Sequence, residues 1–124
     1  MRKILYVLLI VLLVSCSNNK TEISVNKIDS IQAQEDFNNK KGYVIVDVRT
    51  KEEFLEGHIP GAINIPNEEI SDVRPEKLPD LHQEIYLYCR SGNRSNQAAI
   101  KLIKMGYTDI YDFGGIKDWK GDIE

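Results

Sequence analysis

Short apolar runs recur along the chain and are separated by polar stretches that contain glycine or proline. The run at residues 43–46 is apolar throughout, which is typical of a strand that is covered on both faces in a parallel sheet. Further runs at residues 62–65, 85–88 and 110–113 predict three more strands, and residues 23–25 predict a short first strand.

Helical signals lie between these predicted strands. Asp29 or Ser30 is placed to cap a helix that ends near Asn39 and that packs Ile31 and Phe37 inward. The lysine–glycine pair that follows breaks this pattern before the next strand begins.

A second helix is predicted from the spacing of a capping box. In this motif the hydroxyl of Thr50 accepts a hydrogen bond from the N–H of Glu53. The helix is expected to be short, because Gly57 can end it in a left-handed conformation. Asn67 is expected to cap another helix that continues to Val73.

The clearest helical pattern covers residues 96–105 and ends at Gly106. Its apolar stripe consists of Ala98, Ala99, Leu102 and Ile103. After the last predicted strand, two glycines turn the chain into a short helix that carries Trp119. Because predicted strands and helices alternate, the sequence predicts an α/β domain with a mainly parallel sheet.

The N-terminus carries a different pattern. Arg2 and Lys3 precede an apolar segment at residues 4–14, which is too short to span a bilayer but fits the core of a signal peptide. The segment runs into Ser15 and Cys16 and resembles the lipobox of bacterial lipoproteins, in which cleavage precedes a cysteine that becomes lipidated. The alternative is an uncleaved anchor with an incidental cysteine.

The protein is therefore expected to be exported and held by its lipid at the periplasmic face of the bacterial envelope or at the cell surface. It divides into a signal peptide at residues 1–15, a lipidated N-terminus and tether at residues 16–24, and one domain at residues 25–124. Loss of the signal peptide lowers the net charge from −3 to −5. An acidic domain without a basic stripe argues against nucleic acid as a partner.

The chain contains two cysteines and two histidines, and the histidines are His58 and His82. If Cys16 carries a lipid, Cys89 has no partner in the chain. An unpaired cysteine in an exported protein is typically a reactive or an intermolecular thiol. Since no second cysteine lies near Cys89, neither a metal site nor a cofactor is expected.

Cys89 opens the loop Cys-Arg-Ser-Gly-Asn-Arg-Ser, which joins a predicted strand to a predicted helix. This arrangement aims backbone N–H groups and the positive end of the helix dipole at the cysteine. The dipole, Arg90 and Arg94 favour a thiolate, so the pKa of Cys89 is expected to be depressed. The alternative is a small buried apolar residue at the end of a core strand, but the glycine, serines and arginines beside it favour a reactive site.

Four segments of the chain resemble, in order, the signature segments of the single-domain rhodanese family. They are residues 46–49 with Glu53 and Phe54, residues 57–66, residues 88–95 and residues 106–119. Four matches in the right order are specific, and together they extend over essentially the whole domain that follows the tether.

This resemblance implies a three-layer α/β/α sandwich around a five-stranded, mainly parallel sheet. It also implies that a small anionic donor such as thiosulfate passes its sulfane sulfur to Cys89, and that the Cys89 persulfide passes it to cyanide or an external thiol. The resemblance assigns the cradle around this sulfur to the backbone amides of the loop, contributed by Arg90, Ser91, Gly92, Asn93, Arg94 and Ser95.

Residue chemistry supports these roles. A persulfide is an anion, so a ring of N–H donors stabilises it without a metal, and Gly92 lets the backbone curl so that the donors point inward. Arg90 and Arg94 are expected to bind an anionic donor. Arg90 could instead be an exposed charge, and Arg94 could instead pair with an acid such as Asp47.

Asp47 and Arg49 end a predicted strand, at the edge where open α/β sheets place their sites. We expect both residues to be structural and to brace the neighbouring loops. His58 belongs to a turn in the matching segment and is also expected to be structural.

Other functions use related features. Phosphatases of the cell-division-cycle type place an arginine after five residues, whereas four residues separate Cys89 from Arg94, so this loop suits a single sulfur atom better than a phosphate. Thiol–disulfide oxidoreductases use a second cysteine that the loop lacks. A rhodanese-like binding or sulfur-carrier module that serves one protein partner stays an open alternative, although binding modules of this kind usually lack the loop cysteine.

Overall fold

The computed structural model describes residues 23–124 of the chain. The signal peptide and Cys16, with most of the tether, lie outside these described residues. Five parallel strands form one sheet in the order β1-β5-β4-β2-β3. Their bounds are β1 Asn26–Lys27, β2 Tyr43–Asp47, β3 Ile63–Asn64, β4 Glu84–Cys89 and β5 Ile110–Gly115.

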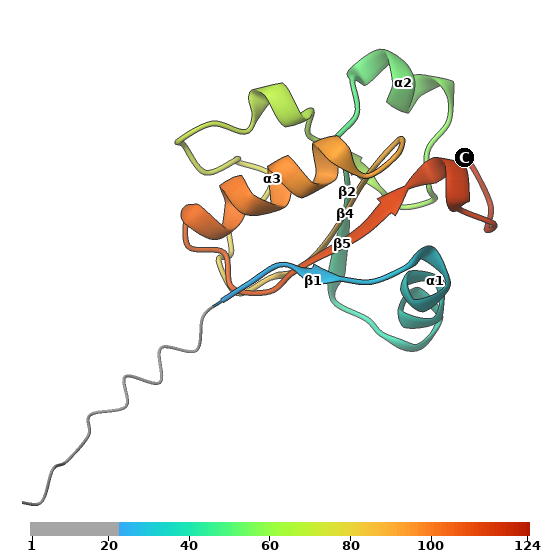
Figure 1. The fold of residues 1–124 in the computed structure, drawn as a ribbon, viewed down its shortest axis with the longest axis horizontal. Helices are drawn as coiled ribbons and strands as arrows, with labels where there is room; N and C mark the ends of the chain where they lie inside the picture. The colour runs from blue at the N-terminus through green and yellow to red at the C-terminus, as the bar shows by residue number, and fades with distance from the viewer. Residues whose placement is uncertain (1–22) are drawn as a thin grey trace, which may run out of the picture.

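Helices cover both faces of this sheet. They are α1 Ser30–Asn39, α2 Lys51–Glu56 and α3 Asn93–Lys104, with short 3-10 helices η1 Asn67–Glu69 and η2 Ile116–Asp118. In Figure 1, α3 lies on one side of the strands and α1 lies on the other. The predicted three-layer α/β/α sandwich with a parallel five-stranded sheet is therefore confirmed.

The central strand β4 divides the core into two clusters. Ile85, Leu87 and Cys89 belong to the cluster that includes the inner residues of α3. Tyr86 and Tyr88 alternate with them and belong to the cluster that includes the inner face of α1. A strand with both faces buried explains the unbroken apolar pattern of this segment.

The helix α1 begins where the sequence predicts. Asp29 is its N-cap, and the Asp29 carboxylate accepts a hydrogen bond from the N–H of Gln32 at 2.8 Å. The prediction that Ile31 packs inward is wrong, because 71% of Ile31 is exposed. Ala33 takes the inner position, and Phe37 packs against the same cluster as predicted.

The capping box of α2 is confirmed, since the side chain of Thr50 and that of Glu53 each accept a hydrogen bond from the other residue's backbone N–H. The left-handed stop at Gly57 is wrong, because its φ of 160° is extended backbone. The Gly57 N–H instead bonds the carbonyl of Phe54, which closes the last turn.

The helix expected from Asn67 to Val73 is also wrong. Only the single turn η1 forms, and Asn67 donates its backbone N–H to the carbonyl of Val48. Ile70 then leaves the turn in an extended conformation and is buried in the core. Burial of this one apolar side chain turns the segment inward before a second helical turn can form.

Several other boundaries differ by a few residues. The first strand starts at Asn26 because pairing with β5 begins there, opposite Tyr111. The helix α3 starts at Asn93, ahead of the predicted residue 96, and its end beside Gly106 is as predicted. The last helical segment is the 3-10 turn η2, and Trp119 directly follows it.

Across residues 23–124, none of the helices is long and apolar enough to cross a membrane.

Candidate active site

Cys89 is the last residue of β4 and is almost fully buried, with 1% of its surface exposed. Its sulfur accepts a hydrogen bond from the backbone N–H of Gly92 at 3.0 Å. The chain between them forms a tight loop, because Gly92 adopts a φ of +107° that a side chain would disfavour. The carboxyl end of a central strand thus presents a sulfur to the loop that follows it.

The start of α3 supplies the donors around this sulfur. The N-cap residue is Gly92, which has no side chain to satisfy the free N–H groups of the first turn. Burial by itself would raise the pKa of the Cys89 thiol, but the hydrogen bonds that Ser95, Gly92 and Ser91 offer to the thiolate outweigh it, and the pKa lies below its ordinary value. The geometry therefore favours an anionic sulfur.

The end of β5 packs against the Cys89 loop. A Cβ atom on Gly115 would lie 2.1 Å from the carbonyl oxygen of Arg90, so the two backbones touch. The same carbonyl accepts a hydrogen bond from the N–H of Lys117 at 3.4 Å. Close approach of β5 leaves the loop little freedom to change its shape.

The other residues of the loop differ in how much of their surface is exposed. Arg90, Ser91 and Asn93 are exposed, whereas Ser95 is fully buried. The loop thus exposes one arginine, Arg90, directly after the buried Cys89.

Arg94 forms an ion pair with Glu53 of α2. Its two terminal nitrogens donate to the two carboxylate oxygens at 2.6 and 3.0 Å. This pair lowers the pKa of Glu53 to about 2, chiefly through the Arg94 hydrogen bond. The acid that pairs with Arg94 is therefore Glu53, whereas Asp47 is occupied by another arginine.

That other arginine is Arg49, and the Asp47–Arg49 pair is buried. The terminal nitrogen of Arg49 lies 2.7 Å from the Asp47 carboxylate and also donates to the carbonyl of Gly57 at 2.6 Å. Asn64 of β3 donates to the carbonyls of both Asp47 and Arg49. These contacts tie the end of β2 to the end of α2 and to β3.

His58 is engaged on the far side of α2. Its Nδ1 donates to the carbonyl of Phe54 at 2.9 Å, and its ring stacks on the Phe54 ring with centroids 3.8 Å apart. Its Nε2 lies 3.5 Å from a carboxylate oxygen of Glu124. These partners hold the turn in place and connect it to the C-terminus.

Two acidic residues of the site were not recognised from the sequence. Glu53 was assigned to the capping box and to a family signature segment, but not to an ion pair with the Cys89 loop. Asp112 was assigned only to a strand, yet it is 5% exposed and its Oδ1 lies 2.8 Å from the hydroxyl of Ser95. The available signal was a carboxylate within an apolar strand, separated by only Phe113 from two glycines.

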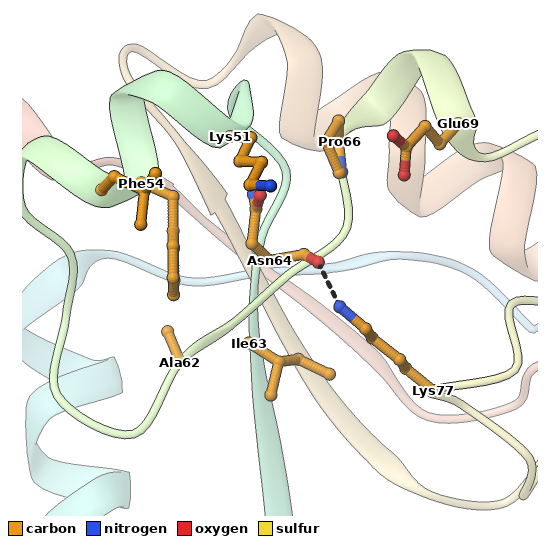
Figure 2. Close-up of a pocket in the computed structure, with 9 residues that line it drawn as sticks. Lys51, Phe54, Ala62, Ile63, Asn64, Pro66, Glu69 and Lys77 are labelled. Carbon is orange, nitrogen blue, oxygen red and sulfur yellow. Dashed lines mark hydrogen bonds between the residues drawn. The ribbon is translucent and has the colours of Figure 1, made fainter.

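A separate pocket of about 480 Å³ lies beside the edge strand β3 (Figure 2). Phe54 and Ile63 contribute apolar walls, and Lys77 reaches across to donate to the carbonyl of Asn64 at 3.1 Å. Its lining includes no residue of the Cys89 loop. Within residues 23–124, histidine, cysteine and acidic side chains form no cluster of three or more that could hold a metal ion.

Sequence comparisons place these features among known proteins. The thiosulfate sulfurtransferase PspE of Escherichia coli is 40% identical over 73 residues, which are 59% of this chain and 70% of that protein. An adenylyltransferase and sulfurtransferase of Candida albicans is 38% identical over 114 residues, which are 86% of this chain but only 25% of that longer protein.

Comparison with solved structures points to the same family as the sequence comparisons. A rhodanese-like domain protein of Staphylococcus aureus superposes with a TM-score of 0.69 at 31% identity, over 80% of this chain and 96% of that chain. A human single-domain sulfurtransferase also has a TM-score of 0.69, at 26% identity, over 80% of this chain and 100% of that chain. The sequence model of the rhodanese-like domain matches residues 30–122. The chain belongs to the rhodanese-like domain family.

Proposed function

We propose that this protein is a sulfurtransferase that carries sulfane sulfur as a persulfide on Cys89. The observation that supports this most directly is the contact of 3.0 Å between the Cys89 sulfur and the Gly92 N–H at the start of α3. Relatives named thiosulfate sulfurtransferase, from Escherichia coli and from Pseudomonas syringae, support the same activity.

The chemistry needs only an activated sulfur and an anion cradle. The Cys89 thiolate attacks the outer sulfur of thiosulfate, the S–S bond of the donor breaks, and sulfite leaves with the bonding electron pair. The product persulfide carries the same single negative charge as the thiolate, so the same N–H groups stabilise both. Nucleophilic attack by cyanide or a thiolate on the outer sulfur then regenerates the Cys89 thiolate.

The two arginines of the loop contribute unequally to donor binding. Arg90 is exposed and directly follows Cys89, and we assign it the attraction of an anionic donor. The charge of Arg94 is balanced by Glu53, so Arg94 contributes less to donor binding. Cys89 is the only cysteine among the described residues, so the acceptor thiol comes from outside this domain.

Intact-mass spectrometry tests the proposal. The full chain with Cys16→Ser keeps Cys89 as its only cysteine. We expect this protein to gain one sulfur atom on incubation with thiosulfate and to lose it on addition of cyanide or a thiol. The matched control, which also carries Cys89→Ser, is expected to fold and to gain nothing. Sulfur gain by the control would contradict the assignment of Cys89.

A second candidate is a sulfur carrier that serves one protein partner. A Bacillus subtilis relative whose name includes the words sulfur carrier protein is 40% identical over 81 residues, which are 43% of that protein. A carrier would hold the persulfide against cyanide and small thiols and release it to its partner. Slow discharge of the loaded protein by both small acceptors would favour this candidate over the enzyme.

We also propose that the protein is exported and anchored by a lipid on Cys16. The support is the sequence alone: basic Arg2 and Lys3, the apolar residues 4–14 and the cysteine that follows. Labelling of expressing bacteria with a fatty acid should tag the protein that carries Cys16. Cys16→Ser should abolish the label, and persistence of the label would contradict this anchor.

A further inference from the structure

The hydroxyl of Ser95 faces more hydrogen-bond acceptors than it can satisfy. Its oxygen lies 2.8 Å from Oδ1 of Asp112, 3.1 Å from the carbonyl of Gly92 and 3.5 Å from the carbonyl of Gly114. A hydroxyl has one hydrogen, and an ionised carboxylate at the shortest distance is the strongest competitor for it. Ser95 therefore donates to Asp112 in the resting protein.

The sulfur of Cys89 lies 3.5 Å from the same hydroxyl oxygen. While the Ser95 hydrogen points to Asp112, the oxygen offers only lone pairs to the sulfur and accepts from the Cys89 thiol. A thiolate has no hydrogen to donate, so it gains from Ser95 only if the hydroxyl hydrogen turns away from Asp112.

We propose that Ser95 is a two-position hydrogen-bond switch and that Asp112 is the positioning residue that sets the pH at which Cys89 ionises. When the Cys89 proton leaves to solvent, the Ser95 hydrogen turns from Asp112 to the sulfur. Oδ1 of Asp112 then keeps the hydrogen bond from the N–H of Gly114 at 3.0 Å. This inference rests on the proposed function, in which Cys89 is the reacting sulfur.

The expected direction follows from the competition. Asp112 holds the hydrogen that would stabilise the thiolate, and its own negative charge also disfavours a second anion nearby. A neutral side chain at this position should therefore lower the pKa of Cys89. The native carboxylate keeps more of Cys89 as the thiol, the form less prone to oxidation, while no sulfur donor is present.

Other charged groups surround the pair and must be held constant. Arg94 on α3 interacts electrostatically with Cys89, and the Asp47–Arg49 pair lies at the end of β2 beside it. Arg90 is the next residue of the loop, and Lys27 of β1 lies opposite Asp112 in the sheet. Substitutions at Ser95 and Asp112 leave all of these in place.

The test is a double-mutant cycle on the full chain with Cys16→Ser, in which ultraviolet absorbance reports the Cys89 thiolate as pH is raised without any sulfur donor. We expect Asp112→Asn to lower the apparent pKa by about one unit, roughly a tenfold gain in thiolate below the pKa. In a Ser95→Ala background most of that shift should disappear. No shift, or a shift of equal size without Ser95, would overturn the switch.

A second measurement does not require the Asp112→Asn variant to fold. It follows the carboxyl ¹³C resonances of protein that keeps Asp112. The Asp112 resonance should show an inflection at the Cys89 pKa, and Ser95→Ala should remove it. A flat resonance through that pH range would overturn the proposal. Since both measurements omit the donor, they can fail while sulfur transfer stands, and a failure of sulfur loading leaves them interpretable.

Discussion

Two arginine–carboxylate pairs lie near the Cys89 loop, and they differ in how much water reaches them. In the Asp47–Arg49 pair the side chains are 0% and 8% exposed, and in the Glu53–Arg94 pair they are 28% and 32% exposed. Their shortest N···O distances are nearly equal, at 2.7 and 2.6 Å. The same chemical contact therefore occurs in two environments within one site.

The environments predict different roles. A charge left alone in the interior is strongly destabilising, so the buried pair matters for folding even if the intact pair adds little net stability. A partly exposed pair adds less stability, because water screens both charges. We therefore expect the Glu53–Arg94 pair to affect the binding of an anionic donor more than it affects folding.

Arg49→Met should give the largest effect. It leaves the Asp47 carboxylate buried without its cation, and we expect a loss of about 3–5 kcal/mol in the free energy of unfolding. Chemical denaturation measures this loss. The control is the double variant Asp47→Asn/Arg49→Met, which leaves neither charge of this buried pair and should recover much of the stability. If the double variant is as unstable as the single one, the loss comes from packing and not from the uncompensated carboxylate.

Thr50→Ala should give the next largest effect. Thr50 follows Arg49 in the chain and caps the helix that carries Glu53, so it connects the two ion pairs. Loss of the cap should cost about 1 kcal/mol in the free energy of unfolding. Thr50→Ser keeps the hydroxyl and should restore most of that stability, whereas an equal loss in both variants would show that the methyl group matters more than the cap.

The local features of the fold could be predicted because neighbouring residues encode them. The capping box and the apolar run of β4 each need only a few consecutive positions. The inner face of α1 could be predicted only in part: Phe37 packs inward as expected, but Ile31 lies outside, since a helical period does not tell which side of a weakly amphipathic helix meets the sheet. The turn at η1 depends on the burial of Ile70, which is set by the tertiary fold.

The site divides in the same way. Cys89, Gly92 and the two arginines lie in one short loop. The chemistry of this loop could therefore be predicted from consecutive residues. The partners that tune this loop come from elsewhere: Glu53 is 41 residues away from Arg94, and Asp112 is 17 residues away from Ser95. No local pattern connects such positions, and only the parallel packing of β4, β5 and α2 around the loop brings them together.

Substitutions in the exposed pair should change donor affinity in opposite directions. Arg94→Met removes a cation and leaves Glu53 facing the site, so the KM for thiosulfate should rise roughly two- to fivefold. Glu53→Gln releases the charge of Arg94, so the same KM should fall by a similar factor. The free energy of unfolding should change by less than about 1 kcal/mol in either variant. Parallel changes in KM, or a collapse in stability, would show that the pair acts on loop structure.

The smallest effect should be the pH dependence of this partly exposed pair, because water screens its charges and leaves less stability than the pKa shift alone would imply. Arg94 lowers the pKa of Glu53 from an ordinary 4.5 to about 2 in the folded protein. Because the folded pKa is depressed, the pair contributes its full stability above pH 4.5 and loses it as pH falls through about 2. The free energy of unfolding of the native chain should therefore fall relative to that of Glu53→Gln across this window, measured by denaturation at matched ionic strength.

Added salt should shrink the difference, because exposed charges are screened, whereas the penalty of Arg49→Met should hardly respond. A salt-resistant difference at Glu53 would mean that this pair behaves like the buried one and that the contrast between the two environments is wrong.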